Sequence, residues 1–269
     1  MKAKPTAAGS TLDVAKKAGA MWLVLSRPEA LNALNDDIVD GLGNAFDRIE
    51  ADDEIRVVVL TGTGRAFCAG ADLKDAKNNA ESDSGEASER FLDRVQALMY
   101  RIESFPRPTI CAINGLTLGA GLELALCCDI IVASAQARIG DGHAKFGLLP
   151  GGGSSARLPR RISTAAAKLV MFTADLYTAE ELREWGLIQR VYEEADFGDS
   201  VQLLCERIGS RSPLAVTRMK ELVDKTSSRS CAEALAAERE MMRLHRGSYD
   251  RAEGLAAFAE KREPRFLGR

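Results

Sequence analysis

Hydrophobic and polar positions in the first sixty residues change period from two to about 3.6. Residues 11–15 and 20–25 alternate as β-strands do, and residues 17–19 supply the turn of a hairpin. Asn35 can cap a following helix whose apolar residues recur every three or four positions. These apolar positions are Ile38, Leu42, Ala45 and Ile49. Residues 56–61 then form an apolar run typical of a buried strand, which begins a β-α-β order.

The same order continues through the middle of the chain. Residues 75–90 contain no large apolar side chain, so they are predicted to form a surface loop. A helix follows the loop and precedes a strand at residues 109–113. The apolar stripe of that helix consists of Phe91, Leu92, Val95, Leu98, Met99 and Ile102. A second helix over residues 120–127 and a strand at residues 129–133 favour an α/β fold with largely parallel pairing.

The C-terminal part has a different pattern. A strand is predicted at residues 187–192, and after it only helical periodicity is found. The predicted helices span residues 201–208, 213–223 and 231–244. Thr178 and Glu181 have the spacing of a capping box, which marks an earlier helix start. We therefore expect an α/β core over residues 1–195 and a helical region over residues 196–269.

Composition and charge narrow the class of protein. The 269 residues are 46% hydrophobic and 28% charged, as in ordinary globular proteins. The formal net charge of −3 gives no general attraction to nucleic acid or acidic lipid, although a local basic pocket stays possible. The start of the chain lacks the apolar segment of a secretory signal, and no later run has membrane-spanning length. A cytoplasmic protein is expected.

The six cysteines give no sign of a metal site. They lie mostly inside apolar stretches, without CxxC spacing or a neighbouring histidine cluster. They are Cys68, Cys111, Cys127, Cys128, Cys205 and Cys231. We interpret them as reduced and buried thiols that pack as small hydrophobic side chains.

Two strand-to-helix junctions, at residues 57–74 and 109–129, pass through turns of glycine and alanine. Small residues let a ligand approach the backbone, and the first turn of a helix has unpaired amide hydrogens. Two such amides could hold a developing negative charge, but the glycines could also serve tight turns alone. Neither junction has the GxGxxG or GxxxxGK[ST] pattern of nucleotide-binding loops. The sequence PGGG at residues 150–153 is interpreted as a tight turn rather than a phosphate loop.

Several segments resemble the crotonase (enoyl-CoA hydratase/isomerase) family. Residues 25–34, 66–74 and 114–129 are similar to its successive signatures in order and spacing. Residues 148–153 and 257–262 extend the resemblance over nearly the whole chain. The resemblance implies a superhelix of repeated ββα units with a C-terminal helical trimerisation region. It also implies an acyl-CoA thioester as substrate, stabilisation of its enolate, no metal or separate cofactor, and a homotrimer or dimer of trimers.

The resemblance also assigns binding residues. The two oxyanion amides fall on Ala71 and Ala120. The other residues implied at the CoA or substrate site are Ala69, Asp72, Leu73 and Lys74. Lys261 and Phe258, in the tail, are similar to residues that complete a neighbouring subunit's site.

Glu123 is the one acid in an otherwise apolar helical stretch, three residues beyond Ala120. It is expected near the same amides, either as a catalytic base or as a partner of the helix dipole. The family's second glutamate is replaced here by His143, which can also carry a proton near neutral pH. Asp141 could orient or supply that proton, or could only form a turn.

The leading prediction is a hydratase-like lyase that uses Glu123 and His143. The alternatives within the fold are a Δ3,Δ2-enoyl-CoA isomerase, which needs one shuttling base, and an acyl-CoA hydrolase or decarboxylase. A homologue that binds acyl-CoA without turnover is the alternative from another class.

Overall fold

Six strands form the larger of two sheets in the computed structural model, which describes residues 10–72, 85–226 and 228–269. Their order is β1-β2-β3-β5-β7-β10. The first two strands pair antiparallel and the remaining neighbours pair parallel. The strands are β1 (Leu12–Lys17), β2 (Ala20–Leu25), β3 (Val57–Gly62), β5 (Thr109–Ile113), β7 (Ile130–Ser134) and β10 (Arg190–Tyr192).

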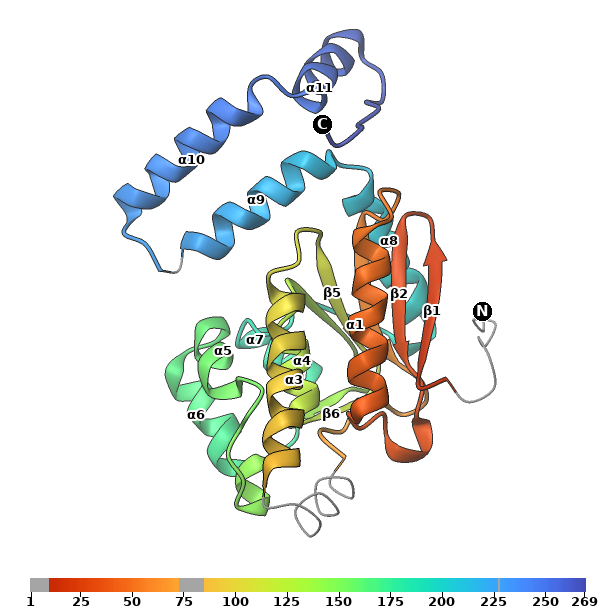
Figure 1. The fold of residues 1–269 in the computed structure, drawn as a ribbon, viewed down its shortest axis with the longest axis vertical. Coiled ribbons are helices and arrows are strands. Elements are labelled where there is room, and N and C mark those ends of the chain that lie inside the picture. The colour runs from red at the N-terminus through yellow and green to blue at the C-terminus, as the bar shows by residue number, and fades with distance from the viewer. Residues whose placement is uncertain (1–9, 73–84, 227) are drawn as a thin grey trace.

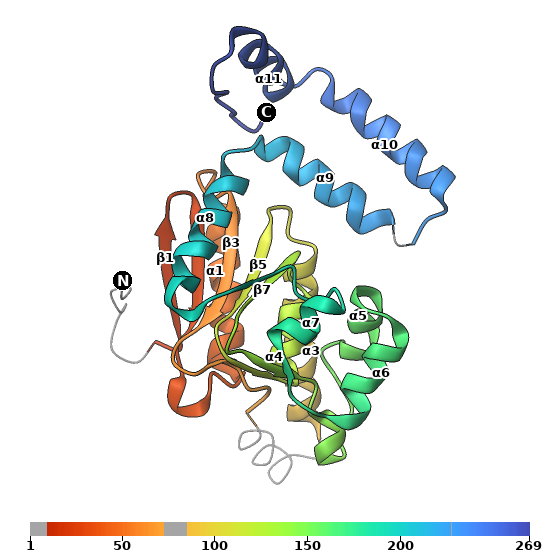
Figure 2. The ribbon, with the colours of Figure 1, turned by 180° about the vertical axis from the view of Figure 1, so that it is seen from behind.

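Helices cover both faces of this sheet (Figures 1 and 2). In β3, Val58 and Leu60 belong to the main core beneath α1 (Asp36–Glu50), α3 (Glu86–Glu103) and α4 (Ala120–Leu126). Val57 and Val59 face the other way, toward α8 (Phe197–Gly209). Both faces of a mostly parallel sheet are buried, so its strands read as nearly continuous apolar runs rather than as alternating ones.

A second sheet of four short strands lies beside the first, in the order β4-β6-β8-β9. Its strands are β4 (Ala66–Cys68), β6 (Leu116–Leu118), β8 (Arg138–Gly140) and β9 (Tyr177–Thr178). The strands β4, β6 and β8 are parallel neighbours. Each follows a strand of the large sheet, so the chain repeats a unit of one long strand, one short strand and a helix. This is the repeated ββα arrangement expected for the family.

Most predicted elements are confirmed, with shifts of at most five residues at their ends. The side chain of Asn35 accepts a hydrogen bond from the amide of Ile38, and Thr178 and Glu181 form the expected capping box. The surface loop was predicted to continue to residue 90, but α3 already begins at Glu86, because small and charged residues suffice for an exposed first turn. The rest of that loop lies largely outside the described residues.

The helical C-terminal region has two parts. Helix α8 belongs to the core, where Phe197, Val201 and Cys205 are buried against the large sheet. The next helices extend away from the core as an arm (Figures 1 and 2). The arm contains α9 (Pro213–Thr226), α10 (Cys231–His245) and α11 (Tyr249–Glu260). None of the helices in the described ranges is long and apolar enough to cross a membrane.

The remaining helices lie between β8 and β10 in the sequence. They are α5 (Ser154–Arg161), α6 (Thr164–Thr173) and α7 (Ala179–Glu184). Three short 3-10 helices complete the described elements: η1 (Pro28–Ala30), η2 (His143–Phe146) and η3 (Glu194–Asp196).

The close packing of α4 on β4 can be tested with two glycines. A methyl group added to Gly121 would place its carbon 2.1 Å from the carbonyl oxygen of Cys68, whereas a methyl group on Gly43 of α1 would meet nothing within 4 Å. We expect Gly121→Ala to lower the free energy of unfolding by about 2–4 kcal/mol, because backbone has to move. Gly43→Ala should raise it by about 0.5–1 kcal/mol. Urea unfolding of both variants measures the contrast, and equal effects would contradict the packing described.

Candidate active site

Three neighbouring strands of the small sheet end at the same edge and deliver the predicted site residues. Ala71 follows β4, Ala120 follows β6, and His143 follows β8. Parallel neighbours are about 4.8 Å apart and their carboxyl ends share one edge, which is where ligands bind in many α/β proteins. The structure therefore gathers residues that are 72 positions apart in the chain.

The turns after β4 and β6 approach each other through their backbones. A methyl carbon on Gly70 would lie 3.8 Å from the amide nitrogen of Ala120. The bridge between Leu34 and Ala71 uses the amides of Leu34 and Asp72, so the amide of Ala71 faces away from that bridge. Ala120 is the first residue of α4 and has no carbonyl one turn before it within the helix. Within the described part of the chain, neither amide donates a hydrogen bond. Two amides that have no acceptor among the described residues thus follow the carboxyl ends of neighbouring strands.

Glu123 lies one turn into α4 with 1% of its surface exposed. Its Oε1 accepts a hydrogen bond of 3.0 Å from the backbone amide of Ser154, the first residue of α5. This contact gives the buried carboxylate the hydrogen-bond partner that burial of a polar group requires. A methyl group on Gly152 would meet Glu123 Oε2 at 2.6 Å. The loop at residues 150–153 therefore packs directly against this carboxylate.

His143 is held by a buried acid from its own loop. Its Nδ1 lies 2.8 Å from Oδ1 of Asp141, whose residue is 1% exposed. The Asp141 hydrogen bond raises the pKa of His143 above its ordinary value, and the charge of Glu123 acts in the same direction. A methyl carbon on Gly119 would lie 3.7 Å from His143 Nε2, so the other ring nitrogen faces the turn that leads into α4.

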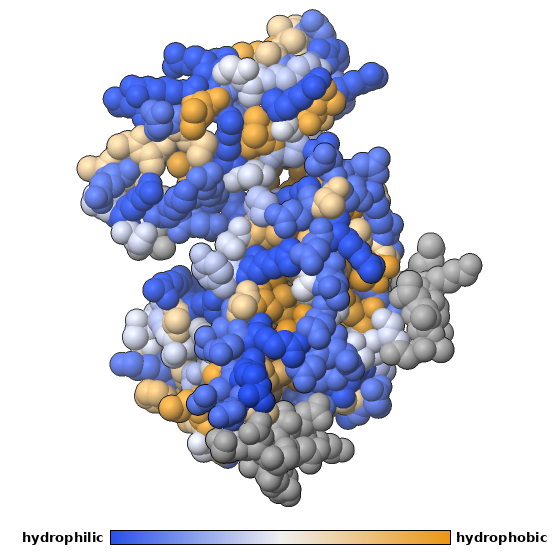
Figure 3. Space-filling view, in the orientation of Figure 1, coloured by the Kyte–Doolittle hydropathy of each residue, from blue (hydrophilic) through white to orange (hydrophobic). Residues whose placement is uncertain are grey.

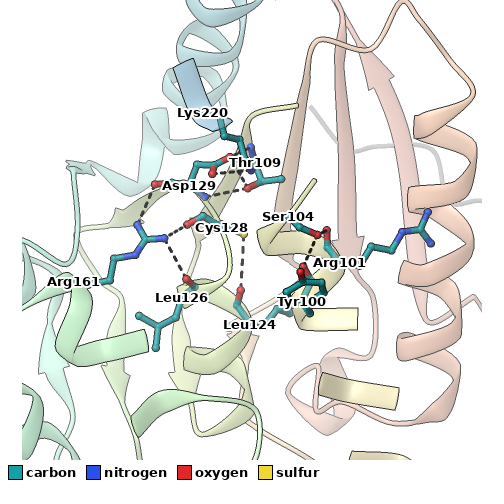
Figure 4. A network of polar contacts seen from close by, with 10 residues as sticks. All are labelled: Tyr100, Arg101, Ser104, Thr109, Leu124, Leu126, Cys128, Asp129, Arg161 and Lys220. Atoms are coloured by element: carbon teal, nitrogen blue, oxygen red, sulfur yellow. Dashed lines mark hydrogen bonds and ion pairs between the residues drawn. The ribbon is translucent and has the colours of Figure 1, made fainter. Parts of the chain in front are cut away.

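The far end of α4 is fixed by a polar network (Figure 4). The guanidinium of Arg161 donates to the carbonyl oxygens of Leu126, Cys128 and Asp129, which satisfies acceptors that a helix end leaves free. The carboxylate of Asp129 accepts from the amide and hydroxyl of Thr109. It also pairs at 2.8 Å with Lys220 of α9. This network fixes the axis of α4, and with it the position of Glu123.

The other predicted binding residues differ in where they lie and in what they contact. Ala69 donates its amide to Leu31, and the Asp72 carboxylate is paired with Arg27 at 3.1 Å, which fastens the turn after β4. The predicted positions Leu73 and Lys74 lie outside the described residues. The predicted tail residues Phe258 and Lys261 stand in the last turn and at the C-terminal cap of α11. That helix is at the far end of the arm from α4 (Figure 1).

Sequence reasoning missed Ser154 and Gly152, which surround Glu123. The sequence PGGG followed by two serines is a weak signal for a helix start, and it was interpreted as a plain turn. A buried acid in α4 needs a donor from elsewhere, but sequence alone does not say that α5 supplies it. Only the packing of α4 on α5 brings the amide of Ser154 to the carboxylate.

The cysteines are all free, and five of them are buried as predicted. Burial raises the pKa of Cys68 to about 12, so this thiol next to the site stays protonated. The sixth, Cys231, was predicted to be buried but is exposed at the start of α10, on the arm rather than in the core. Over the described ranges, no group of three or more histidine, cysteine or acidic side chains is arranged to hold a metal ion.

Comparison with known proteins agrees with the fold. Residues 15–269 match the family model described as enoyl-CoA hydratase/isomerase. The chain is 35% identical over 254 residues to 1,2-epoxyphenylacetyl-CoA isomerase of Escherichia coli K12, covering 93% of this chain and 96% of that protein. It is also 35% identical over 260 residues to 2,3-dehydroadipyl-CoA hydratase of the same strain, covering 97% and 100%.

A solved structure is similar over almost the whole chain. The enoyl-CoA hydratase of Bacillus anthracis superposes with a TM-score of 0.92 at 32% identity, covering 96% of this chain and 100% of that one. The sequence resemblance, the repeated ββα units and the global similarity lead to one conclusion. This chain belongs to the enoyl-CoA hydratase/isomerase family and has the crotonase fold.

Proposed function

We propose that this enzyme binds an acyl-CoA thioester and holds the thioester oxygen between the amides of Ala71 and Ala120. The observation that carries the proposal is that these two amides follow adjacent strand ends and donate no hydrogen bond within the described ranges. A donor of this kind is typically worth about 3–4 kcal/mol in the transition state, because negative charge grows on the oxygen as the enolate forms.

The reaction that fits the side chains best is hydration of an enoyl-CoA. Glu123 takes a proton from water as the oxygen attacks the β-carbon, and His143 in its charged form gives a proton to the α-carbon. The mechanism needs a protonated His143, and the hydrogen bond with Asp141 raises the pKa of this ring, which supports that role. The hydrogen bond from the Ser154 amide holds the Glu123 carboxylate in position.

A Δ3,Δ2-enoyl-CoA isomerase is the second candidate. One observation favours it: a histidine stands where the family's hydratases have a second glutamate, and Glu123 alone could shuttle a proton between two carbons. Relatives of similar identity are named as an isomerase and as a hydratase. Hydrolysis, decarboxylation and binding without turnover are further alternatives that the substitution leaves open.

Coenzyme A enters this proposal as part of the substrate, and no separate cofactor takes part. The turn after β4 would receive it, with Ala69, Asp72, Leu73 and Lys74 as the proposed contacts. Asp72 contributes mainly by holding this turn in place, because its carboxylate is paired with Arg27. A cytoplasmic location, expected from the sequence, belongs to the same proposal.

We also propose a homotrimer or a dimer of trimers built through the arm. Apolar side chains interrupt the charged surface of the arm (Figure 3). The most exposed of them are Met219, Val223, Met242, Leu244 and Phe258, each at least 61% exposed. In the assembly, Lys261 would reach the site of a neighbouring subunit. The arm begins after α8, so the proposed assembly region is shorter than the 196–269 expected from sequence.

The first prediction separates binding from turnover. Glu123→Gln keeps the shape of the side chain and can still accept from Ser154, but it cannot take a proton. We expect calorimetry with acetoacetyl-CoA, in the presence of a chelator, to show affinity close to that of the natural enzyme. Turnover of crotonyl-CoA should fall by about 100-fold or more. Absence of binding by the natural enzyme would overturn the proposed function.

The second prediction concerns His143. We expect His143→Ala to lower kcat by about 100-fold. Because the acid must be protonated, activity of the natural enzyme should fall as pH rises through the pKa of His143, and the variant should lack this alkaline limb. Rates of crotonyl-CoA hydration between pH 6 and 10 measure both effects. A large gain in hydration by His143→Glu would instead show that the natural enzyme performs another reaction.

The third prediction concerns assembly. We expect light scattering to give a trimer or hexamer, and the double substitution Val223→Glu with Met242→Glu to shift it toward monomer, because charge is placed on the apolar face of the arm. The exposed Arg239→Ala serves as the matched control on α10 and should leave the mass unchanged. A natural enzyme that is monomeric and fully active would contradict the proposed assembly.

A further inference from the structure

We propose that Asp141 is the positioning residue of this site. It fixes the imidazole of His143 so that the Nδ1–H of the ring donates to the Asp141 carboxylate and Nε2 of the ring faces the first turn of α4. The inference deepens the proposed function, because it assigns the residue that prepares the second proton carrier. It rests on that function only for its kinetic consequence.

Asp141 contacts His143 at two points, the ring and the backbone. One oxygen, Oδ1, lies 2.8 Å from His143 Nδ1 and also accepts from the backbone amide of His143 at 3.3 Å. Gly142 joins the two residues and has a φ of 77°, a left-handed conformation that glycine adopts easily. This turn lets both the backbone amide and the ring of His143 contact the Asp141 carboxylate. Two contacts to the same oxygen fix both the start of η2 and the rotation of the ring.

A carboxylate at this place decides the tautomer. An ionised Asp141 can only accept, so Nδ1 of His143 has to donate to it in the neutral as well as the charged ring. The exchangeable proton is then the one on Nε2. That nitrogen faces Gly119 and α4, on the side of Ala120 and Glu123. The proton that His143 can exchange is thus directed at the proposed reaction centre.

The environment keeps Asp141 ionised although it is buried. Burial by itself raises the pKa of this carboxyl, but the hydrogen bond with His143 and the neighbouring Ser154 hydroxyl outweigh burial, and the pKa lies below its ordinary value. Asp141 Oδ2 and Ser154 Oγ have no hydrogen bond of ordinary length within the described ranges. Unpaired buried polar atoms are costly, so they are expected where a functional demand outweighs stability.

Residue 154 also links the two proposed proton carriers. Its amide donates to Glu123 and its hydroxyl lies beside Asp141, which in turn holds His143. A turn-forming aspartate would be expected at the surface, with its carboxylate on backbone amides alone. Asp141 is instead buried and aimed at an imidazole, which favours the positioning role over the turn alone.

The charge on His143 is set by few groups. Asp141 and Glu123 raise the pKa of the ring. Among the described residues, η2 itself carries Lys145, and α6, which packs against η2, carries Lys168 as its one charged residue. Removing the charge of Asp141 therefore leaves Glu123 as the remaining acid near the ring, and the pKa of His143 should fall.

Nitrogen-15 NMR of the histidine rings tests this directly, because the chain contains two histidines, His143 and His245. In the natural enzyme we expect the neutral ring of His143 to carry its proton on Nδ1, with a pKa above the ordinary value. Asp141→Asn keeps an acceptor but removes the charge, so the tautomer should persist while the pKa falls. His245 on the arm is the internal reference, and Asp199→Asn on the exposed side of α8 is the matched control.

The kinetic readout follows from the same shift. The alkaline limb of kcat should move to lower pH in Asp141→Asn, so that the rate at pH 8 falls by about 10-fold while KM for the acyl-CoA stays nearly constant. A purely structural role would instead lower stability and weaken binding at every pH. His143→Ala should abolish any further effect of Asp141→Asn on the pH profile, because the two residues act through one ring.

Two results would overturn the proposal: a natural His143 ring protonated on Nε2 in its neutral form, or a pKa of His143 that is unchanged by Asp141→Asn. If the variant fails to fold, the tautomer and pKa of the natural enzyme still decide. The NMR measurement does not depend on turnover. Absence of hydration together with the expected tautomer would refute the proposed hydration alone, whereas hydration with an unchanged pKa would refute the role of Asp141 alone.

Discussion

The parallel pairing of three short strands is the constraint on which the site depends. Because β4, β6 and β8 lie side by side, the turns that follow them meet at one edge, and each turn supplies one part of the site. The first turn of α4 also has to pack directly against β4. At this contact there is no room for a methyl group on Gly121 beside the Cys68 carbonyl. The large sheet and its helices hold this small sheet in place.

Electrostatics follow from that packing. A buried acid and a half-buried histidine are costly unless each has a partner, and here α5 supplies an amide to Glu123 while Asp141 holds His143. Both partners come from the segment that runs from the end of β8 to the first residue of α5. This segment also contains His143, one of the proposed proton carriers. The network around Asp129 anchors the other end of α4, so the helix is fixed at both ends.

The sequence revealed the long elements and the identities of the main side chains, because apolar periodicity and caps are local. Asn35 and the strand at residues 109–113 were predictable in this way. Strands of two or three residues such as β4 and β9 are too short to show a period of two, so the small sheet was not predicted as such. The partners of Glu123 and His143 were missed or left open because tertiary packing, rather than spacing, brings them together.

In the proposed reaction, the two backbone amides polarise the thioester carbonyl of the substrate. The most direct measurement is the infrared stretch of a carbonyl-carbon-13 enoyl-CoA bound to Glu123→Gln, in which the substrate is expected to persist. Hydrogen bonds from the amides of Ala71 and Ala120 should shift the carbonyl stretch to lower frequency than in water, because they draw charge onto the oxygen. A bound thioester whose stretch equals that of the free substrate would contradict the account.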